Sequence, residues 1–268
     1  MIGYLGPINS FTYMAASSFY VKDELLPYSS LFHLFEALKN DEVDGIVVPI
    51  ENSIEGSVNI VLDRLFELPF HINREVVSKI ELSLLSNSTS LSTIKNVISH
   101  PHALAQCRNT LLEELGKYKE ILSYSTSDAV KRLKECDDSF AAIASKNAVK
   151  NDMNILLYDI GDKKNNVTRF ILVTKTLEVA GFHNKCSIVC SPKINQSGAL
   201  YDILHEFAIR GIGLSKIESR PKKDLLGEYV FYIDLEGNIE DELIKEALDI
   251  IKFKATYLKI IGSYYTKK

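Results

Sequence analysis

The sequence lacks three features that would each indicate a particular class of protein. No apolar run approaches the roughly 18 to 20 residues that a membrane-spanning helix needs. Lys and Arg are dispersed rather than gathered in a basic stripe, and a net charge of −4 with a pI near 5.9 does not favour nucleic acid. Met1 leads directly into a strand-like segment, without the regions typical of a signal peptide. We therefore expect a cytoplasmic protein with no membrane segment and no nucleic-acid partner.

Cysteine is also scarce. None of the four cysteines has the CxxC spacing of a metal site. Two of them lie in an apolar, strand-like run without a nearby pair of histidines. The pattern favours buried thiols in a reducing compartment over disulfides or metal ligands, and we expect no metal. The four are Cys107, Cys136, Cys186 and Cys190.

What is present is an ordinary globular composition. Of the 268 residues, 46% are hydrophobic and 25% are charged, so disorder is not expected. The length allows one large or two ordinary domains.

The chain opens with a strand, a polar turn and a helix. Residues 2–5 form a short apolar strand, a Gly-Pro turn follows, and Asn9 and Ser10 are good N-cap residues for a helix over 11–20. Backbone N–H groups at a helix start favour an anion. A purely structural turn is the alternative reading of this segment.

A second cluster of polar residues, at 51–57, follows the apolar strand at 45–50. This strand is too continuously apolar to be half exposed, so we expect it inside a sheet covered on both faces. In a doubly wound sheet, such a strand delivers Asn52 to the crevice where ligands bind. The same polar cluster could equally cap the helix predicted at 58–66.

The pattern then restarts after an extended segment at 70–85. A strand at 96–99 ends on Ser99. Pro101, at the start of a helix over 101–115, and Gln106, one and a half turns further on, would both face the same mouth. A further helix at 128–134, a strand at 140–144 and another helix starting at Ser145 follow. Buried Ser and helical Gln are commonly structural, and that alternative stays open.

The segment NNVTRFILV, at 165–173, sets a hydroxyl, a guanidinium and an aromatic ring before an apolar strand. An Arg beside a buried run either extends to solvent or meets an anion. Alternatively, Thr168, Arg169 and Phe170 are an ordinary loop-to-strand junction. The return of the chain at 168–174 indicates two α/β lobes with a cleft between them and a hinge at this strand.

After residue 174 the pattern changes to βαββαβ, typical of a ferredoxin-like fold with both helices on one sheet face. Domains of this size often expose sheet edges and pair with another copy. We expect strands at 186–190, 214–217, 228–235 and 255–261, with helices at 200–208 and 240–251.

Six motifs together resemble the prephenate dehydratase family, in its bacterial, monofunctional form with a C-terminal ACT domain. They span nearly the whole chain, and six in order are highly specific. The motifs are YLGPxxSFTxxAA at 4–16, VPIENSxEGSVN at 48–59, SHPxALAQC at 99–107, NxTRF at 166–170, GALYxxL at 198–204 and KIESRP at 216–221.

The resemblance implies an α/β fold with a two-lobed, periplasmic-binding-protein-like catalytic domain at 1–177 and an ACT domain at 184–268. The lobes would comprise about 1–75 plus 166–177, and 76–165. The implied reaction converts prephenate to phenylpyruvate with loss of carbon dioxide and water, and it needs orientation and a hydrogen-bond donor rather than a cofactor or metal. L-Phenylalanine would inhibit at the ACT domain of a homodimer or homotetramer.

The resemblance also implies residue roles. Thr168 would donate to the leaving C4 oxygen, Arg169 would anchor a carboxylate and Phe170 would form the wall of the site. Further substrate contacts would come from Ser10, Asn52, Ser99 and Gln106. Residues implied in binding phenylalanine are Gly198, Ala199, Leu200, Gly213, Leu214, Glu218, Ser219, Arg220 and Pro221.

The chain departs from the family pattern at three places. Asn9-Ser10 replaces a usual Gly-Thr, which keeps a hydroxyl but loses the backbone freedom of Gly. His102 replaces a common Gln, as a tolerated substitution or a titrating group. Gly213 replaces Asn and removes an amide from the effector site. Arogenate dehydratase activity, or a non-catalytic amino-acid sensor, are the alternative functions.

Overall fold

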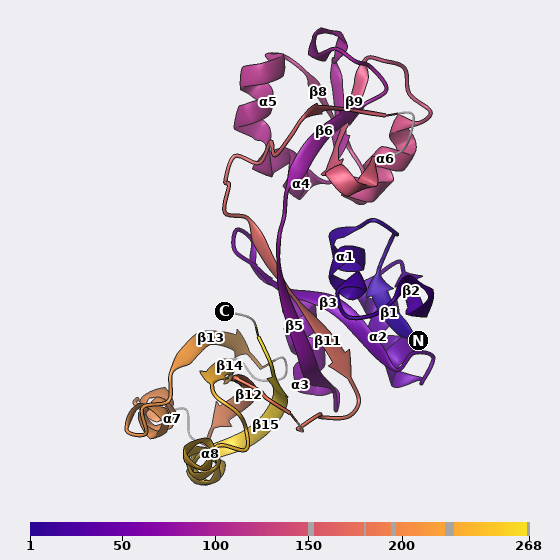
Figure 1. The fold of residues 1–268 in the computed structure, drawn as a ribbon. Coiled ribbons are helices and arrows are strands. Elements are labelled where there is room, and N and C mark those ends of the chain that lie inside the picture. Colours follow the sequence, from indigo (N-terminus) through magenta and orange to yellow (C-terminus); the bar gives the residue numbers. More distant parts are fainter. Residues whose placement is uncertain (150–152, 180, 194–196, 223–227, 267–268) are drawn as a thin grey trace.

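The computed structural model describes residues 1–149, 153–179, 181–193, 197–222 and 228–266. The chain forms two lobes and a C-terminal domain, and two long strands run between the lobes (Figure 1). These strands are β5 (His71–Lys79) and β11 (Val167–Thr174), and they pair antiparallel along their whole length. Both strands therefore belong to the first lobe and point toward the second.

The first lobe is built around β3 (Gly45–Asn52), between β11 and β1 in the sheet. Ile46 and Val48 pack into one cluster of buried residues, whereas Val47 packs into another on the opposite face. This burial confirms the expected strand covered on both faces. The other elements are β1 (Ile2–Leu5), β2 (Leu25–Tyr28), β4 (Gly56–Ser57), α1 (Phe11–Ser17), α2 (Leu31–Lys39) and α3 (Asn59–Glu67).

The second lobe contains a separate sheet in the order β10-β6-β9-β7-β8. The expected extended segment at 70–85 is two strands, because β5 ends in one sheet and β6 begins the other. The expected helix after Ser145 is only a short 3-10 turn. The elements are β6 (Leu82–Ser86), β7 (Asn96–Ser99), α4 (Pro101–Gln106), α5 (Arg108–Leu115), β8 (Lys119–Leu122), α6 (Thr126–Leu133), β9 (Phe140–Ser145) and β10 (Asn154–Leu157).

The helix expected over 101–115 is interrupted at Cys107, which separates α4 from α5. The carboxylate of Asp162 accepts hydrogen bonds from the backbone N–H groups of Asn109 and Thr110, at 3.1 and 3.0 Å. A carboxylate from a distant segment thus satisfies the first turn of α5, and sequence periodicity alone carries no signal for such a partner.

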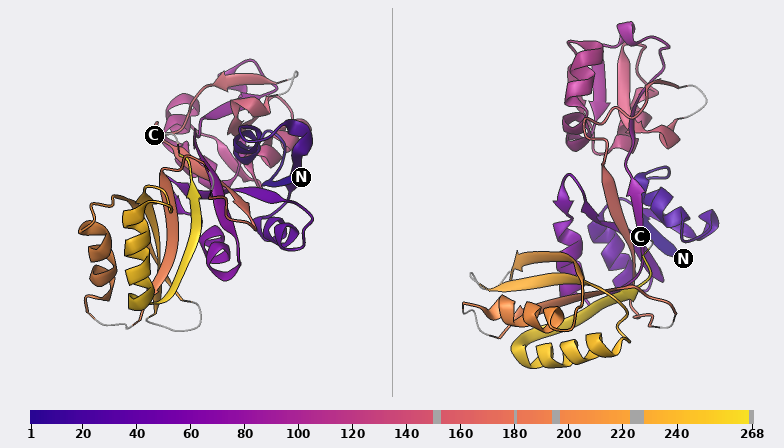
Figure 2. Two further views of the ribbon diagram at one scale, coloured as in Figure 1. Left: turned by 60° about the horizontal axis from the view of Figure 1, so that its bottom comes forward. Right: turned by 60° about the vertical axis from the view of Figure 1, so that its left-hand side comes forward.

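The C-terminal domain has the predicted βαββαβ order and the sheet order β13-β14-β12-β15. Both helices lie on one face of this sheet (Figure 2), as a ferredoxin-like fold requires. The elements are β12 (Lys185–Pro192), α7 (Ala199–Ala208), β13 (Leu214–Pro221), β14 (Tyr229–Glu236), α8 (Glu242–Lys254) and β15 (Ala255–Tyr264).

The opposite face of this sheet packs on the first lobe. The Tyr232 hydroxyl donates to the Leu62 carbonyl oxygen of α3 at 2.8 Å, and the Lys259 ammonium donates to the Leu65 carbonyl oxygen at 2.7 Å. β15 also pairs with β5 where Gly262 lies beside Ile72, which joins the two sheets. A Cβ at Gly262 would come within 2.6 Å of the Ile72 carbonyl oxygen, so this junction requires glycine.

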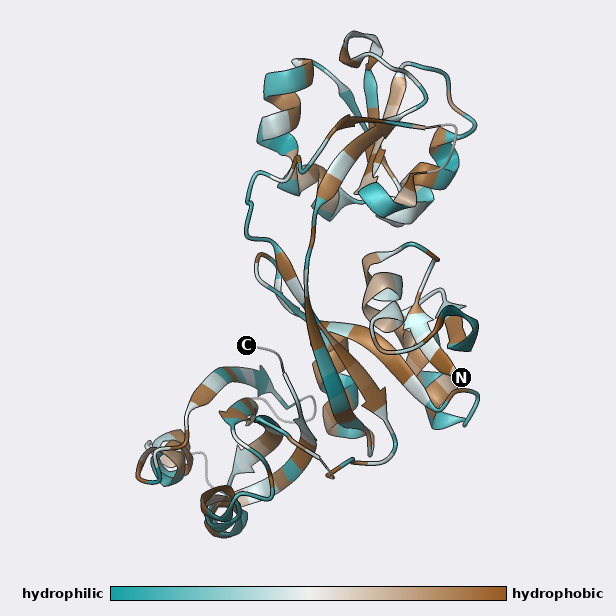
Figure 3. Cartoon of the chain, in the orientation of Figure 1, coloured by the Kyte–Doolittle hydropathy of each residue, from teal (hydrophilic) through white to brown (hydrophobic). Residues whose placement is uncertain are grey.

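Hydrophobic residues are concentrated in the central strands, and hydrophilic residues lie on the outer faces of the helices (Figure 3). Within the described ranges, no helix is both long enough and apolar enough to span a bilayer.

Three of the four cysteines are fully buried, as predicted, and only Cys136 is partly accessible. Burial raises the pKa of Cys107, Cys186 and Cys190 to about 12, so these thiols stay protonated as well as shielded. We expect a thiol reagent at pH 8 to modify one cysteine in the native protein and four after denaturation. Rapid native labelling of more than one thiol would contradict this burial.

Candidate active site

Alternation along β11 divides the predicted site between two faces of the strand. Phe170 packs into the cluster beneath α1, and Ile171 packs into the cluster that reaches the C-terminal domain. Because successive strand residues point to opposite faces, Thr168 lies on the α1 side and Arg169 on the other side. The sequence placed these side chains together, and the pleat of the strand separates them.

Asn52, at the end of β3, lies beside Thr168. Its Oδ1 accepts hydrogen bonds from the backbone N–H groups of Ile54 and Glu55, at 2.8 and 3.0 Å. These two donors fix the orientation of the amide, because the oxygen must face them and the nitrogen must face away. The Nδ2 atom then donates to Thr168 Oγ1 at 2.8 Å and to Asn166 Oδ1 at 2.7 Å.

The Thr168 hydroxyl is therefore an acceptor from Asn52, which leaves its own proton available. The side chain is nearly buried, with 7% of the residue exposed. Among the hydrogen bonds of the described residues, none uses the Thr168 hydroxyl as donor. A hydrogen bond into the oxygen favours the form that has given up its proton, so Asn52 makes this hydroxyl a better donor.

A chain of side chains continues from Asn52 into the second lobe. Asn166 Nδ2 donates to Gln106 Oε1 at 3.1 Å, and Gln106 Nε2 donates to Glu55 Oε1 at 3.0 Å. The Oε2 atom of Glu55 lies 3.3 Å from His102 Nδ1. The predicted residues Asn52, Thr168 and Gln106 are thus connected. Asn166 and Glu55 were not predicted, although both belong to the quoted motifs.

Ser99, Ser10 and Phe170 make other contacts. Ser99, fully buried at the end of β7, donates to the Ile143 carbonyl oxygen at 2.8 Å. Ser10 accepts from the Tyr13 N–H at 3.1 Å, as the N-cap of α1. Phe170 is 2% exposed. These contacts account for each side chain structurally, and the substrate roles of the three stay predictions.

Arg169 is enclosed by carboxylates of the protein itself. Its Nη1 lies 2.6 Å from Asp234 and 3.5 Å from Glu51, and its Nε lies 3.1 Å from Glu75. Burial disfavours the charged guanidinium, but Asp234, Tyr264 and Glu75 outweigh this effect and raise the pKa of Arg169. The role of this residue as an anchor for a substrate carboxylate stays a prediction.

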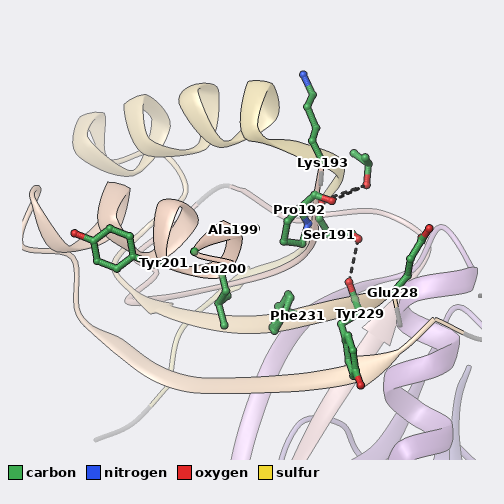
Figure 4. A pocket seen from close by; sticks show the side chains of 11 residues that line it. Ser191, Pro192, Lys193, Ala199, Leu200, Tyr201, Glu228, Tyr229 and Phe231 are labelled. Carbon is green, nitrogen blue, oxygen red and sulfur yellow. Dashed lines mark hydrogen bonds between the residues drawn. The ribbon is translucent and has the colours of Figure 1, made fainter. Parts of the chain in front are cut away.

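The C-terminal domain contains a cavity of about 400 Å³, within the usual range for small-ligand sites of roughly 300–1,000 Å³. Figure 4 shows Pro192, Leu200 and Phe231 around it. The lining includes the predicted Gly198, Ala199 and Leu200.

The predicted residues of β13 do not line this cavity. Glu218 accepts a hydrogen bond from Ser57 at 2.7 Å, and Arg220 pairs with Asp63 at 3.0 Å, so both face the first lobe. Ser219 pairs with Phe231 in the sheet register and lies on the cavity side. The structure therefore divides this group between the two faces of the sheet.

Comparisons with known proteins decide the family. The sequence profile described as prephenate dehydratase matches residues 2–177. The chain belongs to the prephenate dehydratase family. It is 40% identical over 266 residues to a bifunctional chorismate mutase/prephenate dehydratase of Aquifex aeolicus, covering 98% of this chain and 73% of the relative. It is also 40% identical over 243 residues to the prephenate dehydratase of Methanocaldococcus jannaschii, covering 88% and 86%.

A solved prephenate dehydratase has the same arrangement of lobes and domain. The crystal structure of the Arthrobacter aurescens enzyme in complex with L-Phe aligns with a TM-score of 0.90 and 33% sequence identity, covering 99% of this chain and 89% of that one. The two-lobed catalytic part and the ferredoxin-like C-terminal domain are thus those of a prephenate dehydratase.

The structure explains one departure from the prephenate dehydratase pattern. Asn9, where the family usually has Gly, adopts a positive φ of 65°. Asn tolerates this left-handed conformation better than most residues, so the turn keeps its shape without glycine. The expected loss of backbone freedom therefore does not alter the turn. His102, the second departure, is largely exposed and faces Glu55.

Proposed function

We propose that this chain is a prephenate dehydratase that converts prephenate to phenylpyruvate in L-phenylalanine biosynthesis. The observation that carries the proposal is the hydrogen bond from the Asn52 amide to Thr168 Oγ1, which leaves the hydroxyl proton for an acceptor. Family membership supports the same reaction. The composition and the absence of a membrane-spanning helix among the described residues favour a cytoplasmic location.

In the proposed mechanism, the carboxylate at the ring carbon leaves as carbon dioxide. Its bonding electrons move into the ring, the C4–oxygen bond breaks, and the ring becomes aromatic. The departing hydroxide takes the Thr168 proton and leaves as water, and Thr168 recovers a proton from solvent. Thr168 stabilises the leaving oxygen by donating to it as charge develops, and Asn52 stabilises the threonine oxygen in turn. Aromatisation of the ring drives the reaction, and orientation and this one donor are the proposed contributions of the protein.

Ser10, Ser99, Gln106 and Phe170 are the proposed substrate contacts, whereas the anchor role predicted for Arg169 competes with its three carboxylate partners within the protein. Support is most direct for Gln106, which belongs to the same hydrogen-bond chain as Thr168. Asn52, by contrast, uses its amide for protein contacts, so we propose that it acts through Thr168.

We further propose that L-phenylalanine inhibits the enzyme by binding at the C-terminal domain of a homodimer or homotetramer. The cavity beside Gly198, Ala199 and Leu200 supports this assignment, as does the L-Phe complex of the Arthrobacter relative. Gly213, Leu214, Ser219 and Pro221 are the other proposed contributors, whereas Glu218 and Arg220 face the first lobe and would contribute by positioning β13.

Gly213→Asn tests the effector site. An added side chain there would meet Glu236 at 3.0 Å, a distance that a small shift of that flexible carboxylate relieves. The restored amide provides a hydrogen-bond donor and acceptor, so we expect L-phenylalanine to inhibit at a concentration about 5–10-fold lower, equivalent to one net hydrogen bond. Inhibition curves of the variant and the wild type measure this effect. Unchanged inhibition would remove position 213 from the effector site.

One assay tests the function as a whole. Purified enzyme is incubated with prephenate or arogenate, with and without L-phenylalanine, and phenylpyruvate and phenylalanine are quantified. We expect phenylpyruvate from prephenate, with inhibition by L-phenylalanine. A preference for arogenate would indicate the second dehydratase activity. No product from either substrate would indicate a sensor.

A further inference from the structure

We propose that Arg169 is a positioning residue that couples the C-terminal domain to Thr168 through its ion pair with Asp234. The inference rests on the proposed dehydratase function and adds the route by which the C-terminal domain controls it. Four observations support it: the partners of Arg169, the support of Asp234, the two faces of β14, and the place of Arg169 beside Thr168.

The partners of Arg169 come from three different strands. Asp234 belongs to β14 of the C-terminal domain, Glu75 to β5 and Glu51 to β3, at 2.6, 3.1 and 3.5 Å from the guanidinium. The Arg169 side chain is only 12% exposed. A planar guanidinium contacts its partners with fixed directions. The position of this side chain therefore depends on how β14 lies relative to the strands of the first lobe.

Asp234 is itself held firmly. Its Oδ1 accepts from the Ser187 hydroxyl at 2.6 Å, and Ser187 lies 2.8 Å from the Tyr264 hydroxyl. Ser187 and Tyr264 are fully buried, and Asp234 is 4% exposed. The carboxylate is thus fixed within the sheet of the C-terminal domain and moves only with that sheet.

The strand that carries Asp234 also lines the effector cavity. Tyr229 and Phe231 of β14 line the cavity, whereas Tyr232 and Asp234 face the first lobe. A ligand in the cavity contacts one face of β14, and Arg169 contacts the other face. A displacement of this single strand therefore reaches both sites.

Arg169 follows Thr168 directly in β11, so a shift of the arginine backbone also moves the threonine. A misplacement of a reacting group by about 1 Å can cost roughly 10²-fold in rate. A movement of β14 that shifts Thr168 by about 1 Å would therefore inhibit.

The experiment compares Asp234→Asn with Tyr232→Phe. Asp234→Asn removes the charge of the link but leaves Arg169 paired with Glu75 and Glu51. Tyr232→Phe removes a contact between the same two domains, from the same face of the same strand, but to α3. L-Phenylalanine binding is measured by calorimetry, and kcat and KM for prephenate are measured with and without saturating L-phenylalanine.

We expect the Kd of Asp234→Asn for L-phenylalanine to stay within about threefold of the wild-type Kd. The factor by which saturating L-phenylalanine lowers the rate should fall at least about fivefold, the lower end of allosteric coupling. Tyr232→Phe should keep both binding and inhibition. Full inhibition of Asp234→Asn would overturn the proposal. Equal loss of inhibition in Tyr232→Phe would also overturn it, because the effect would then belong to the whole domain interface.

Arg169→Lys gives a second test from the catalytic side, and it decides the question if Asp234→Asn does not fold. A positioning role predicts a lower kcat and weakened inhibition, with KM within about threefold of the wild type. A selective rise in KM would instead support the substrate-anchor role and overturn the proposal.

Hydrogen exchange separates this proposal from the proposed function. L-Phenylalanine should change deuterium uptake at residues 167–174 in the wild type but not in Asp234→Asn, whether or not prephenate is turned over. If prephenate is not turned over but L-phenylalanine still changes deuterium uptake at residues 167–174, only the dehydratase function is rejected. Normal turnover and inhibition without any exchange response would reject the coupling alone.

Discussion

Replacing Thr168 with Ala lowers kcat for prephenate about 10²–10⁴-fold, the range expected for loss of a positioned proton donor. KM should change little, because the hydroxyl acts mainly on the leaving oxygen as the bond breaks. Without the hydroxyl, Asn52 Nδ2 keeps Asn166 Oδ1 and the Val167 carbonyl oxygen as acceptors, so we expect the melting temperature to stay near that of the wild type. Steady-state kinetics and a thermal melt of the variant provide the measurements.

Thr168→Ser is the matched control for this variant. It keeps the hydroxyl that accepts from Asn52 and can donate to substrate, and it removes only a methyl group. We expect its kcat to stay within about tenfold of the wild type. A Thr168→Ala enzyme as active as Thr168→Ser would remove the hydroxyl from the mechanism.

The second large effect is expected for Asn52→Asp. An Asp at this position can still accept from the backbone N–H groups of Ile54 and Glu55, so the turn after β3 should be retained. It cannot donate to Thr168. The Thr168 hydroxyl would instead donate its proton to the new carboxylate, and that proton would no longer be available to the substrate. We expect kcat to fall by about 10²-fold or more, approaching the loss in Thr168→Ala.

A kinetic comparison of both variants and their combination tests this interpretation. If Asn52 acts through Thr168, Asn52→Asp combined with Thr168→Ala should be little worse than Thr168→Ala alone. Fully additive losses would instead indicate that Asn52 contacts the substrate independently. Asn52→Ala is the control for an effect on folding. It removes the acceptor of the Ile54 and Glu55 N–H groups as well as the donor to Thr168, so it should lower the melting temperature, whereas Asn52→Asp should not.

The fold could be predicted from the sequence where local pattern and burial agree. The apolar segment at 45–50 predicted β3, and the change of period after residue 174 predicted the βαββαβ order of the C-terminal domain. The break at Cys107 could not be predicted, because a carboxylate from a distant segment, Asp162, caps the second helix. β8 was missed, since its four residues, two charged and two apolar, are too few to show an alternating pattern.

For the candidate site, the sequence predicted which residues are present more accurately than it predicted the faces to which their side chains point. Thr168, Asn52 and Gln106 were singled out and do lie in one hydrogen-bond chain. Thr168 and Arg169 were taken as side-by-side contributors, but a strand alternates its side chains between faces. Tertiary packing decides whether the anion beside Arg169 belongs to a substrate or to another domain of the protein. Asp234 lies 65 residues away in the sequence, so its ion pair with Arg169 could not be predicted.

The pairing of β15 with β5 has a consequence for the catalytic domain taken alone. Without the C-terminal domain, β5 would be an open sheet edge, with unpaired backbone groups available to another chain. Glu75, whose side chain is 1% exposed beside Lys185, would lose one of its cations. We therefore expect a protein truncated after residue 177 to aggregate more readily than the full chain.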